Sequence, residues 1–245
     1  MKISIITVAF NSGESIRPTI ESVLAQKQKN IEYRIIDGNS TDQTVPVAES
    51  YRSRMEAAGI DYHIISEPDG GIYDAMNKGI RLAVGDVIGI LNSGDWYEPG
   101  TLGLVKKYFA KTHCALLFGD IRIYRTDGSS FVKKARLRRF QTSRDWNHPT
   151  MFVRAELYKE NPFLNKGIHD DYGFYLKMRR MKVKTVIVRE VLAGFRMGGA
   201  SNKKSLKAAL KRISDRYRYC YRANGYSRWY LAECVAIEAA KFLLG

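Results

Sequence analysis

The sequence predicts an α/β protein with a mostly parallel, doubly wound sheet, a smaller and less regular second half and a helical C-terminal tail. Two observations lead to this fold class. Apolar runs alternate with amphipathic stretches over the first half of the chain, and each apolar run ends in a cluster of polar residues. Alternation of strands and helices at this spacing is typical of parallel sheets with helices on both faces. A chain of 245 residues with 45% hydrophobic content can bury one well-packed core and carry a tail.

The first half contains three strand–helix repeats and a fourth strand. The expected strands are Ile3–Phe10, Ile31–Asp37, Asp61–Glu67 and Val87–Leu91. The expected helices are Glu14–Gln26, a segment from Thr41 towards Ala58, and Tyr73–Val84. The first helix has a single apolar face, because its apolar side chains recur with the helical period at Ile16, Ile20, Val23 and Leu24.

The second half is less regular, with no low-complexity linker and no sharp domain boundary. The expected strands are Ala115–Gly119, Ile121–Tyr124, Thr150–Val153 and Thr185–Arg189. The expected helices are Arg154–Asn161, Asp170–Met181 and one or two helices after Lys203.

The charge balance favours polyanionic partners. The chain has 40 Lys and Arg residues against 25 Asp and Glu residues, a net charge of +15. Such an excess suits nucleic acid, anionic lipid or diphosphate ligands and does not choose among them. Three dispersed cysteines, Cys114, Cys220 and Cys234, without a C-x-x-C pattern, indicate a reducing compartment. No secretory signal and no run of about 20 apolar residues is evident, so we expect a cytoplasmic protein, soluble or peripheral to a membrane.

Carboxylates gather where the predicted strands end. Asp37 ends the second strand, Glu67 and Asp69 lie at the end of the third and Asp95 follows the fourth, and the carboxyl ends of parallel strands meet at one rim of the sheet. Carboxylates repel each other there unless a cation or a donor-rich ligand lies among them. A metal ion with a polar nucleotide would meet this requirement. Capping of the following helix is the alternative, and for Asp42 it is at least as good.

The familiar phosphate-binding loops are absent from the sequence. Neither G-x-x-x-x-G-K-[ST] nor a G-x-G-x-x-G after the first strand occurs. A P-loop nucleotidase and an ordinary dinucleotide dehydrogenase are therefore disfavoured. The predicted site would read its nucleotide with carboxylates and backbone groups.

Four segments in order carry a specific resemblance. They are Ile5–Asn11 (IITVAFN), Ile36–Asp42 (IDGNSTD), Ser66–Gly79 (SEPDGGIYDAMNKG) and Leu91–Asp95 (LNSGD). The sequence resembles the family 2 glycosyltransferases of the GT-A fold, and within them enzymes of colanic-acid, capsule and O-antigen assembly. The match is dense from Met1 to about Tyr97 and sparser to about Ser201.

The resemblance implies an inverting transfer of a sugar from a nucleotide-sugar, with UDP favoured. The acceptor would be a hydroxyl of a glycan or of a polyprenyl-diphosphate-linked sugar in the biosynthesis of surface polysaccharide such as lipopolysaccharide. It also implies a GT-A domain over residues 1–201, with a nucleotide-binding half at 1–97 and an acceptor and catalytic-base half at 98–201. Residues 202–245 would form a basic helical tail. The implied nucleotide-binding residues are Thr7, Val8, Ala9, Asn11, Asp37, Asp69, Asn92 and Ser93.

The implied metal motif departs from the usual family pattern. Relatives commonly have Asp-x-Asp or Asp-x-Asp-Asp where this chain has Asn92-Ser93-Gly94-Asp95. Only Asp95 can supply an anionic oxygen to Mn²⁺ or Mg²⁺, with substrate phosphates completing the shell. We therefore expect weak metal binding without nucleotide.

The resemblance also places the general base in the second half. Asp171 aligns with the family's catalytic base and Asp170 with the acid before it, in Ile168-His169-Asp170-Asp171. An acidic pair that favours the start of a helix is the alternative. The remaining candidates for diphosphate or acceptor contacts are Asp74, Lys78, Trp146, His148, His169 and Arg196, together with the loop Gly198–Ser201. Asp74 and Lys78 fit equally well as an i, i+4 ion pair, and Trp146 could belong to the core.

The tail predicts a membrane-surface contact or a solvated helix face. Basic residues from Lys203 to Arg222 interleave with three tyrosines and an apolar stripe at Leu206, Leu210 and Ile213. The contact would be with the anionic inner face of the membrane. A nucleic-acid-binding protein is the rival class, but the acidic rim and the lack of a helix-turn-helix disfavour it, so we expect no nucleic-acid partner. A family relative inactivated through Asn92 and Gly94 is a third interpretation.

Overall fold

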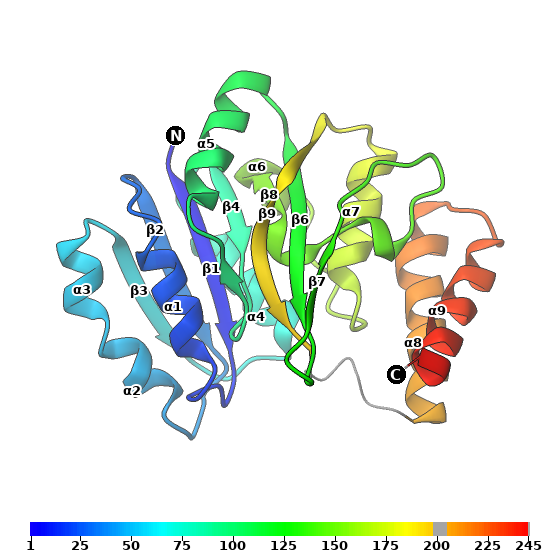
Figure 1. Cartoon of the computed structure of the whole chain (residues 1–245), viewed down its shortest axis with the longest axis horizontal. Helices are drawn as coiled ribbons and strands as arrows, with labels where there is room; N and C mark the ends of the chain where they lie inside the picture. The colour runs from blue at the N-terminus through cyan, green and yellow to red at the C-terminus, as the bar shows by residue number, and fades with distance from the viewer. Residues whose placement is uncertain (198–204, 245) are drawn as a thin grey trace.

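A computed structural model describes residues 1–197 and 205–244 and shows a nine-stranded sheet within them (Figure 1). The strand order is β3-β2-β1-β4-β8-β6-β9-β5, and β7 pairs with β6. The strands are β1 (Ile3–Ala9), β2 (Ile31–Asp37), β3 (Asp61–Ser66), β4 (Val87–Ile90), β5 (Trp96–Tyr97), β6 (Leu116–Tyr124), β7 (Ser130–Lys133), β8 (Phe152–Arg154) and β9 (Thr185–Arg196).

The helices connect these strands and form the C-terminal part of the chain. They are α1 (Ile16–Leu24), α2 (Thr44–Glu49), α3 (Arg52–Ala57), α4 (Ile72–Leu82), α5 (Thr101–Thr112), α6 (Ala155–Glu160), α7 (Asp170–Arg180), α8 (Leu206–Asp215) and α9 (Tyr230–Leu244). Short 3₁₀ turns are η1 (Ser143–Asp145), η2 (His148–Thr150) and η5 (Arg222–Asn224), and η4 (Arg216–Tyr221) is a π-helical segment that continues α8.

The first half has the parallel sheet that the sequence predicts. β1 pairs in parallel with β2 and β4, and β2 pairs in parallel with β3. All seven residues of β1 are buried, as expected for a parallel strand covered on both faces. The register sets Ala9 beside Asp37, so the ends of the two strands form one rim.

Two separate cores confirm the doubly wound arrangement. Ile3 and Ile5 belong to a core with side chains of α1 and α5, whereas Ile6 and Val8 belong to a core with side chains of α4 and α7. Alternate residues of one strand point to opposite faces, so β1 supplies both cores. Figure 1 shows α1 and α5 in front of the sheet and α4 and α6 behind it.

The second half is a mixed sheet. β8 runs antiparallel to β4 and β6, while β6 and β9 run parallel. The two strands expected at Ala115–Gly119 and Ile121–Tyr124 form one strand, β6, whose register with β9 shifts on both sides of Asp120. This irregularity breaks the apolar pattern at Gly119 and Asp120, which explains why the sequence suggests two strands.

Two further boundaries differ from expectation. The helix expected from Thr41 towards Ala58 is two short helices, α2 and α3, separated at Ser50–Tyr51, and Tyr51 is buried there in the core of α1. The strand expected at Thr185–Arg189 continues to Arg196, because its second half pairs with β6 beyond the irregularity.

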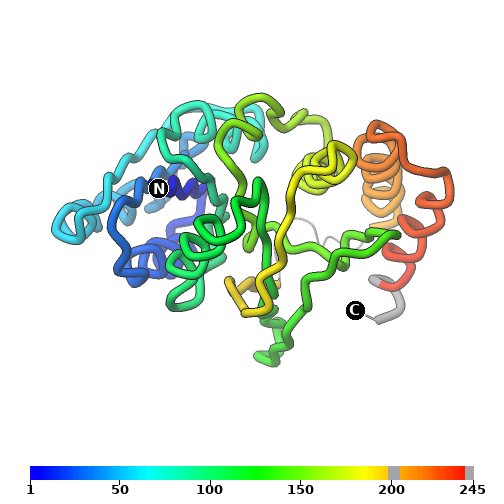
Figure 2. Tube along the Cα trace, turned by 90° about the horizontal axis from the view of Figure 1, so that it is seen from above, coloured from blue at the N-terminus to red at the C-terminus, as the bar shows by residue number. Residues whose placement is uncertain are grey.

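The C-terminal helices pack on the domain. Cys220, Tyr221 and Cys234 are buried in the same core as α4 and α7. Figure 2 shows these helices, in orange and red, at the opposite end of the molecule from α2 and α3. In the part of the chain that the structure describes, no helix combines the length and the apolar character needed to cross a membrane.

We predict opposite effects of the same substitution at two helical glycines. In α4 a Cβ at Gly79 would lie 2.5 Å from Ile6 Cγ2 and 3.2 Å from Ile36 Cγ1, whereas in α5 a Cβ at Gly103 would meet nothing nearer than the flexible end of Gln28 at 3.4 Å. Gly79→Ala should lower the free energy of unfolding by about 1–3 kcal/mol through overpacking. Gly103→Ala should raise it by up to about 1 kcal/mol through helix propensity. Thermal or urea unfolding measures both, and equal shifts would contradict the tight packing of α4 on β1.

Candidate functional site

A cavity of about 800 Å³ opens where β1, β2 and β4 end. Its walls include Val8 and Ala9 from β1 and Asn92 and Ser93 from the loop after β4. Asp69 closes it on the side of β3. This position at the carboxyl ends of parallel strands is the one that the sequence predicts for a nucleotide.

Asp69 lies deep in this wall because Gly38 makes room for it. A Cβ at Gly38 would lie 2.6 Å from Asp69 Oδ2. The other carboxylate oxygen of Asp69 accepts a hydrogen bond from the backbone N–H of Gly71, at 2.8 Å. Asp69 is therefore held at the cavity wall with one oxygen towards Gly38.

Three of the predicted nucleotide-binding residues are not among those that line the cavity. Thr7 is fully buried, and its hydroxyl lies 3.0 Å from the hydroxyl of Tyr33. The carboxylate of Asp37 is also buried and accepts hydrogen bonds from the Ser40 N–H at 2.9 Å and the Ser66 hydroxyl at 2.6 Å. Both side chains shape the rim in the described structure.

Asn11 and Asp42 fix the loop between β2 and α2. Asn11 Oδ1 accepts a hydrogen bond from the Thr41 N–H at 3.1 Å, and its own N–H donates to Ser40 Oγ at 2.8 Å. Asp42 accepts from the Thr44 N–H at 2.9 Å and from the Gly13 N–H at 2.9 Å. The N-cap residue of α2 is Gln43, which makes no side-chain cap, so Asp42 acts one residue earlier and holds the turn that leads into α2.

Two apolar residues on the cavity wall were missed by the sequence reasoning. Phe10 is 62% exposed and Ile72 is 49% exposed, and both line the cavity with Asp69. The sequence does carry a signal for Phe10, because this aromatic residue stands between a fully buried strand and a polar turn. An exposed aromatic ring beside polar groups can stack on a nucleobase.

Asp95 offers a buried carboxylate directly after the cavity residues Asn92 and Ser93. It is 5% exposed, and burial raises the pKa of its carboxyl well above the usual range. Asn92 Oδ1 is buried without a hydrogen-bond partner among the described residues. A buried carboxylate next to an amide oxygen that lacks a donor is the chemistry that a divalent cation satisfies. The residues present therefore fit the expected metal, although Asp95 is not itself among the cavity-lining residues.

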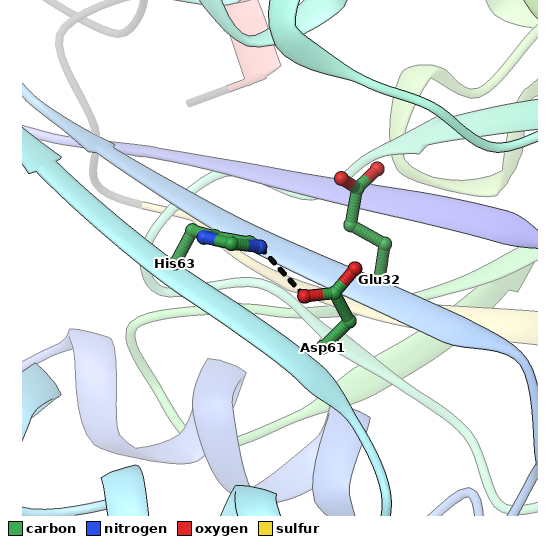
Figure 3. Close-up of side chains that lie close together, drawn as sticks. All are labelled: Glu32, Asp61 and His63. Atoms are coloured by element: carbon green, nitrogen blue, oxygen red, sulfur yellow. Dashed lines mark hydrogen bonds and ion pairs between the residues drawn. The ribbon is translucent and has the colours of Figure 1, made fainter.

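A second group of metal-ligand type lies at the other end of the strands. Glu32, Asp61 and His63 place one ligand atom each within 4.8 Å of one another (Figure 3). Glu32 and Asp61 stand at the starts of β2 and β3, away from the nucleotide cavity. Arg34 pairs with Glu32, and Lys2 pairs with Asp61 at 2.8 Å. These ion pairs already balance both carboxylates, so the group is a network of ion pairs.

Asp74 and Lys78 brace the loop before α4. The Gly70 N–H donates to Asp74 Oδ2 at 2.9 Å, and Lys78 Nζ donates to the Pro68 carbonyl at 2.6 Å. Lys78 also lies 3.1 Å from Glu67 and 4.0 Å from Asp74. The i, i+4 ion pair that was one of the two interpretations is present, and neither residue lines the nucleotide cavity.

A smaller cavity of about 240 Å³ contains the predicted base. Asp171, in the first turn of α7, lines it together with Trp146, His148 and His169. The Tyr73 hydroxyl donates to Asp171 Oδ1 at 3.0 Å. Tyr73 follows Ile72 of the nucleotide cavity, so this hydrogen bond ties the two cavities together. Sequence reasoning did not single out Tyr73, since nothing near it in the sequence indicates its partner.

His148 lies on the other side of the base. Its Nδ1 is 3.3 Å from Asp171 Oδ2, and its ring is 9% exposed. Burial lowers the pKa of His148, although the nearby Asp171 opposes this effect. Its imidazole is therefore neutral at neutral pH, and both ring nitrogens are buried without a hydrogen-bond partner among the described residues, so it lies beside the carboxylate without forming a full ion pair.

The structure separates the two acids at the start of α7. Asp170 is 4% exposed and accepts a hydrogen bond from the Lys166 N–H at 2.7 Å. It lines a different cavity from that of Asp171, and burial raises its pKa. Only Asp171 faces the cavity beside Tyr73 and His148.

The other predicted contacts have mixed outcomes. Trp146 packs in the core, stacked on Tyr175 with ring centroids 5.5 Å apart, and one side of it borders the small cavity. His169 precedes α7 and borders the same cavity. Arg196 is exposed at the end of β9, 5.9 Å from the ring centroid of Trp96. The loop Gly198–Ser201 lies outside the described residues.

The sheet topology, with a cavity at the carboxyl ends of β1, β2 and β4, is that of the GT-A fold. The family model for glycosyl transferase family 2 matches residues 4–186 of the chain. The chain therefore belongs to glycosyl transferase family 2 and is a glycosyltransferase.

Two relatives match nearly the whole chain. A glycosyltransferase of Mycobacterium tuberculosis is 32% identical over 241 residues, which cover 94% of this chain and 89% of the relative. A PGL/p-HBAD biosynthesis glycosyltransferase of Mycobacterium bovis is 28% identical over 216 residues, which cover 86% of this chain and 83% of the relative.

Solved structures share the fold at low identity. Residues 1–349 of S. aureus TarS, in complex with UDP-GlcNAc, superpose with a TM-score of 0.65 at 17% identity, over 100% of this chain and 73% of that one. The mannosyltransferase PcManGT of Pyrobaculum calidifontis, in complex with GDP-Man and Mn²⁺, superposes with a TM-score of 0.70 at 15% identity, over 99% of this chain and 74% of that one.

Proposed function

We propose that this glycosyltransferase moves a sugar from a nucleotide-sugar to an acceptor hydroxyl with inversion, and that Asp171 is the general base. The observation that carries the proposal is the position of Asp171. Its carboxylate is 18% exposed in a cavity and is tied by Tyr73 to the helix that borders the nucleotide cavity. A base at this place can take the proton of a hydroxyl that attacks a sugar held between the two cavities.

The donor site is the cavity of Phe10, Asp69 and Asn92. In this proposal Phe10 stacks on the base, Asp69 accepts from its edge, and backbone groups of Val8 and Ala9 bind beside it. UDP is the favoured base, supported by the complex of TarS with UDP-GlcNAc, while the GDP-Man complex of PcManGT keeps GDP among the candidates. Asp37 and Asn11 act by holding the loop on which the ribose would rest.

Asp95 and Asn92 would hold Mn²⁺ or Mg²⁺. The bound cation supplies electrostatic stabilisation of the diphosphate that leaves with the nucleotide. The Mn²⁺ complex of PcManGT supports this choice. With a single carboxylate on the protein, the cation binds tightly only when the nucleotide phosphates are also present.

The residues around Asp171 keep it ready to accept a proton. The hydrogen bond from Tyr73 fixes one carboxylate oxygen, which leaves Oδ2 beside His148 for the acceptor. Because His148 is neutral, it lies beside the carboxylate without neutralising it. Asp170 does not share this position and supports the start of α7 through the backbone of Lys166.

The acceptor is a hydroxyl of a glycan or of a polyprenyl-diphosphate-linked sugar in surface-polysaccharide biosynthesis, and α8 supplies a membrane contact. On α8, Leu206 is 72% exposed and Leu210 is 59% exposed. Lys207 and Lys211 are exposed beside them, at i, i+4 spacing. Exposed leucines beside lysines suit an anionic lipid surface.

The donor prediction is tested by thermal-shift measurements with UDP, GDP, dTDP and CMP, each with and without Mn²⁺. A nucleotide at 100 times its Kd should stabilise the protein by about 2.7 kcal/mol. We expect one nucleotide, UDP, to shift Tm only with Mn²⁺, and Asp95→Ala to abolish the dependence on Mn²⁺. Absence of a shift with all four nucleotides would contradict the donor site and favour an inactive relative.

The base prediction compares neighbouring acids. Asp171→Asn should lower kcat by at least about 100-fold, as expected when a general base is lost, and should leave the Kd for nucleotide within about twofold. Asp170→Asn is the matched control and should lower kcat far less, because it borders a different cavity. Wild-type turnover in Asp171→Asn, or equal losses in both variants, would show that the base is elsewhere.

The membrane prediction is tested by sedimentation with vesicles that contain anionic lipid. Leu210→Ser should weaken vesicle binding several-fold, because less apolar surface can be buried in the lipid interface. Val84→Ser is the control, because Val84 is also exposed, at 62%, but lies just before β4 and outside α8. Equal binding of both variants would assign the tail to solvent.

A further inference from the structure

A buried arginine from the C-terminal helices reaches the cavity of the predicted base. Arg216, the first residue of η4, is 3% exposed and lines the same cavity as Asp171 and His148. Its Nη2 donates to His169 Nε2 at 2.9 Å and lies 3.5 Å from Glu238 Oε1. The chain thus brings a cation from beyond residue 202, the part predicted as a tail, into its catalytic half.

Much of this guanidinium is unpartnered. Its Nε and Nη1 are buried and have no hydrogen-bond partner among the described residues. A buried N–H without an acceptor carries the full cost of its desolvation, and the cost is larger on a charged group. A side chain kept in this state at a cavity wall is explained if a ligand supplies the missing acceptor oxygens.

A second cation lines the same cavity. Lys133, the last residue of β7, donates from Nζ to the carbonyls of Trp146 at 2.8 Å and Ser143 at 3.2 Å. No carboxylate of the described residues lies within ion-pair distance of it. Burial lowers the pKa of Lys133 to about 8, an effect that an anion in the cavity would reverse.

The position of these cations assigns them to the acceptor side. The small cavity shares none of its lining residues with the nucleotide cavity. The hydrogen bond between Tyr73 and Asp171 connects the helix that borders one cavity with the residue that lines the other. A ligand beyond the base, away from the nucleotide, is the molecule whose hydroxyl is deprotonated.

We propose that the acceptor carries a phosphate group and that Arg216 and Lys133 bind it. The inference rests on the proposed role of Asp171 as the base, because that role makes this cavity the acceptor site. A phosphate offers several charged acceptor oxygens to a guanidinium and an ammonium at once. A neutral sugar would leave Nε and Nη1 of Arg216 without a charged acceptor and the half-buried Lys133 without an ion-pair partner among the described residues. The C-terminal helices are accordingly part of the acceptor site.

The first experiment measures binding of inorganic pyrophosphate by calorimetry, with the nucleotide cavity filled by saturating UDP and Mn²⁺. Arg216→Gln should weaken pyrophosphate binding by about tenfold, the effect of one charge-assisted hydrogen bond. Arg218→Gln is the matched control, because it removes the same charge from an exposed residue of η4. It should change the affinity less than about twofold. Equal losses in both variants would assign the binding to overall charge and overturn the proposal.

The second experiment separates the two sources of phosphate. If the acceptor supplies it, Arg216→Gln keeps the Kd for UDP and the slow hydrolysis of the donor by water, but loses transfer to a sugar linked to a lipid diphosphate. If UDP binding weakens as much as pyrophosphate binding, the ligand is the donor diphosphate and the proposal is wrong. Transfer to a free neutral sugar at equal kcat/KM would also overturn it. A wild-type protein that binds no nucleotide would instead contradict the proposed function.

Arg216 also contacts Glu238, so a folding control is needed. Lys133→Gln removes the other cation without touching the C-terminal helices and should weaken pyrophosphate binding in the same way. Arg216→Lys should restore part of the affinity, because it restores the charge without the fork of N–H groups. If Arg216→Gln lowers Tm and Lys133→Gln leaves binding unchanged, Arg216 is structural and the proposal fails.

Discussion

The hydrogen bond between the Tyr73 hydroxyl and the Asp171 carboxylate, at 3.0 Å, is the contact on which the catalytic arrangement depends. It joins α4 in the parallel half to α7 in the mixed half. A second contact strengthens this junction, since Asn77 of α4 exchanges two hydrogen bonds of 2.9 Å with the backbone of Phe163. Two bonds to one backbone residue fix the loop before α7. The distance between the cavity at the strand ends and Asp171 is therefore set by one helix, and both halves must fold for it to be correct.

The parallel half could be predicted because its signals are local. Each buried strand is a continuous apolar run, and each polar cluster follows a strand end, so β1 to β4 were expected within a few residues. The mixed half could not be predicted in the same way. The direction of β8 depends on its antiparallel pairing with β4 and β6, which no short segment encodes. The irregularity at Asp120 also divides one strand into two apparent ones.

The site residues show the same contrast between features encoded locally in the sequence and features set by distant partners. Val8, Ala9, Asp69, Asn92 and Ser93 line the nucleotide cavity because strand ends converge in a parallel sheet. Asp37 and Lys78 belong to the same motifs, yet their charges are used within the protein, by Ser40 and Ser66 in one case and by Glu67 and Pro68 in the other. Sequence spacing tells which residues reach the rim but not which of them already have partners. Tyr73 and Arg216 were missed for the converse reason, since their partners are distant in the sequence.

The position of Arg216 shows that the positive charges behind the net charge of +15 are not equivalent. Most of the lysines and arginines are exposed and add only a general attraction for anions, which salt screens. Arg216 and Lys133 differ because they line one cavity, where Arg216 is buried and Lys133 half-buried, and a partly desolvated charge interacts more strongly and is screened less. A general positive field attracts any anionic ligand, while the role proposed for Arg216 and Lys133 is to hold one phosphate beside Asp171. In this proposal the excess of charge acts at two ranges, and Arg216 and Lys133 contribute to the choice of substrate.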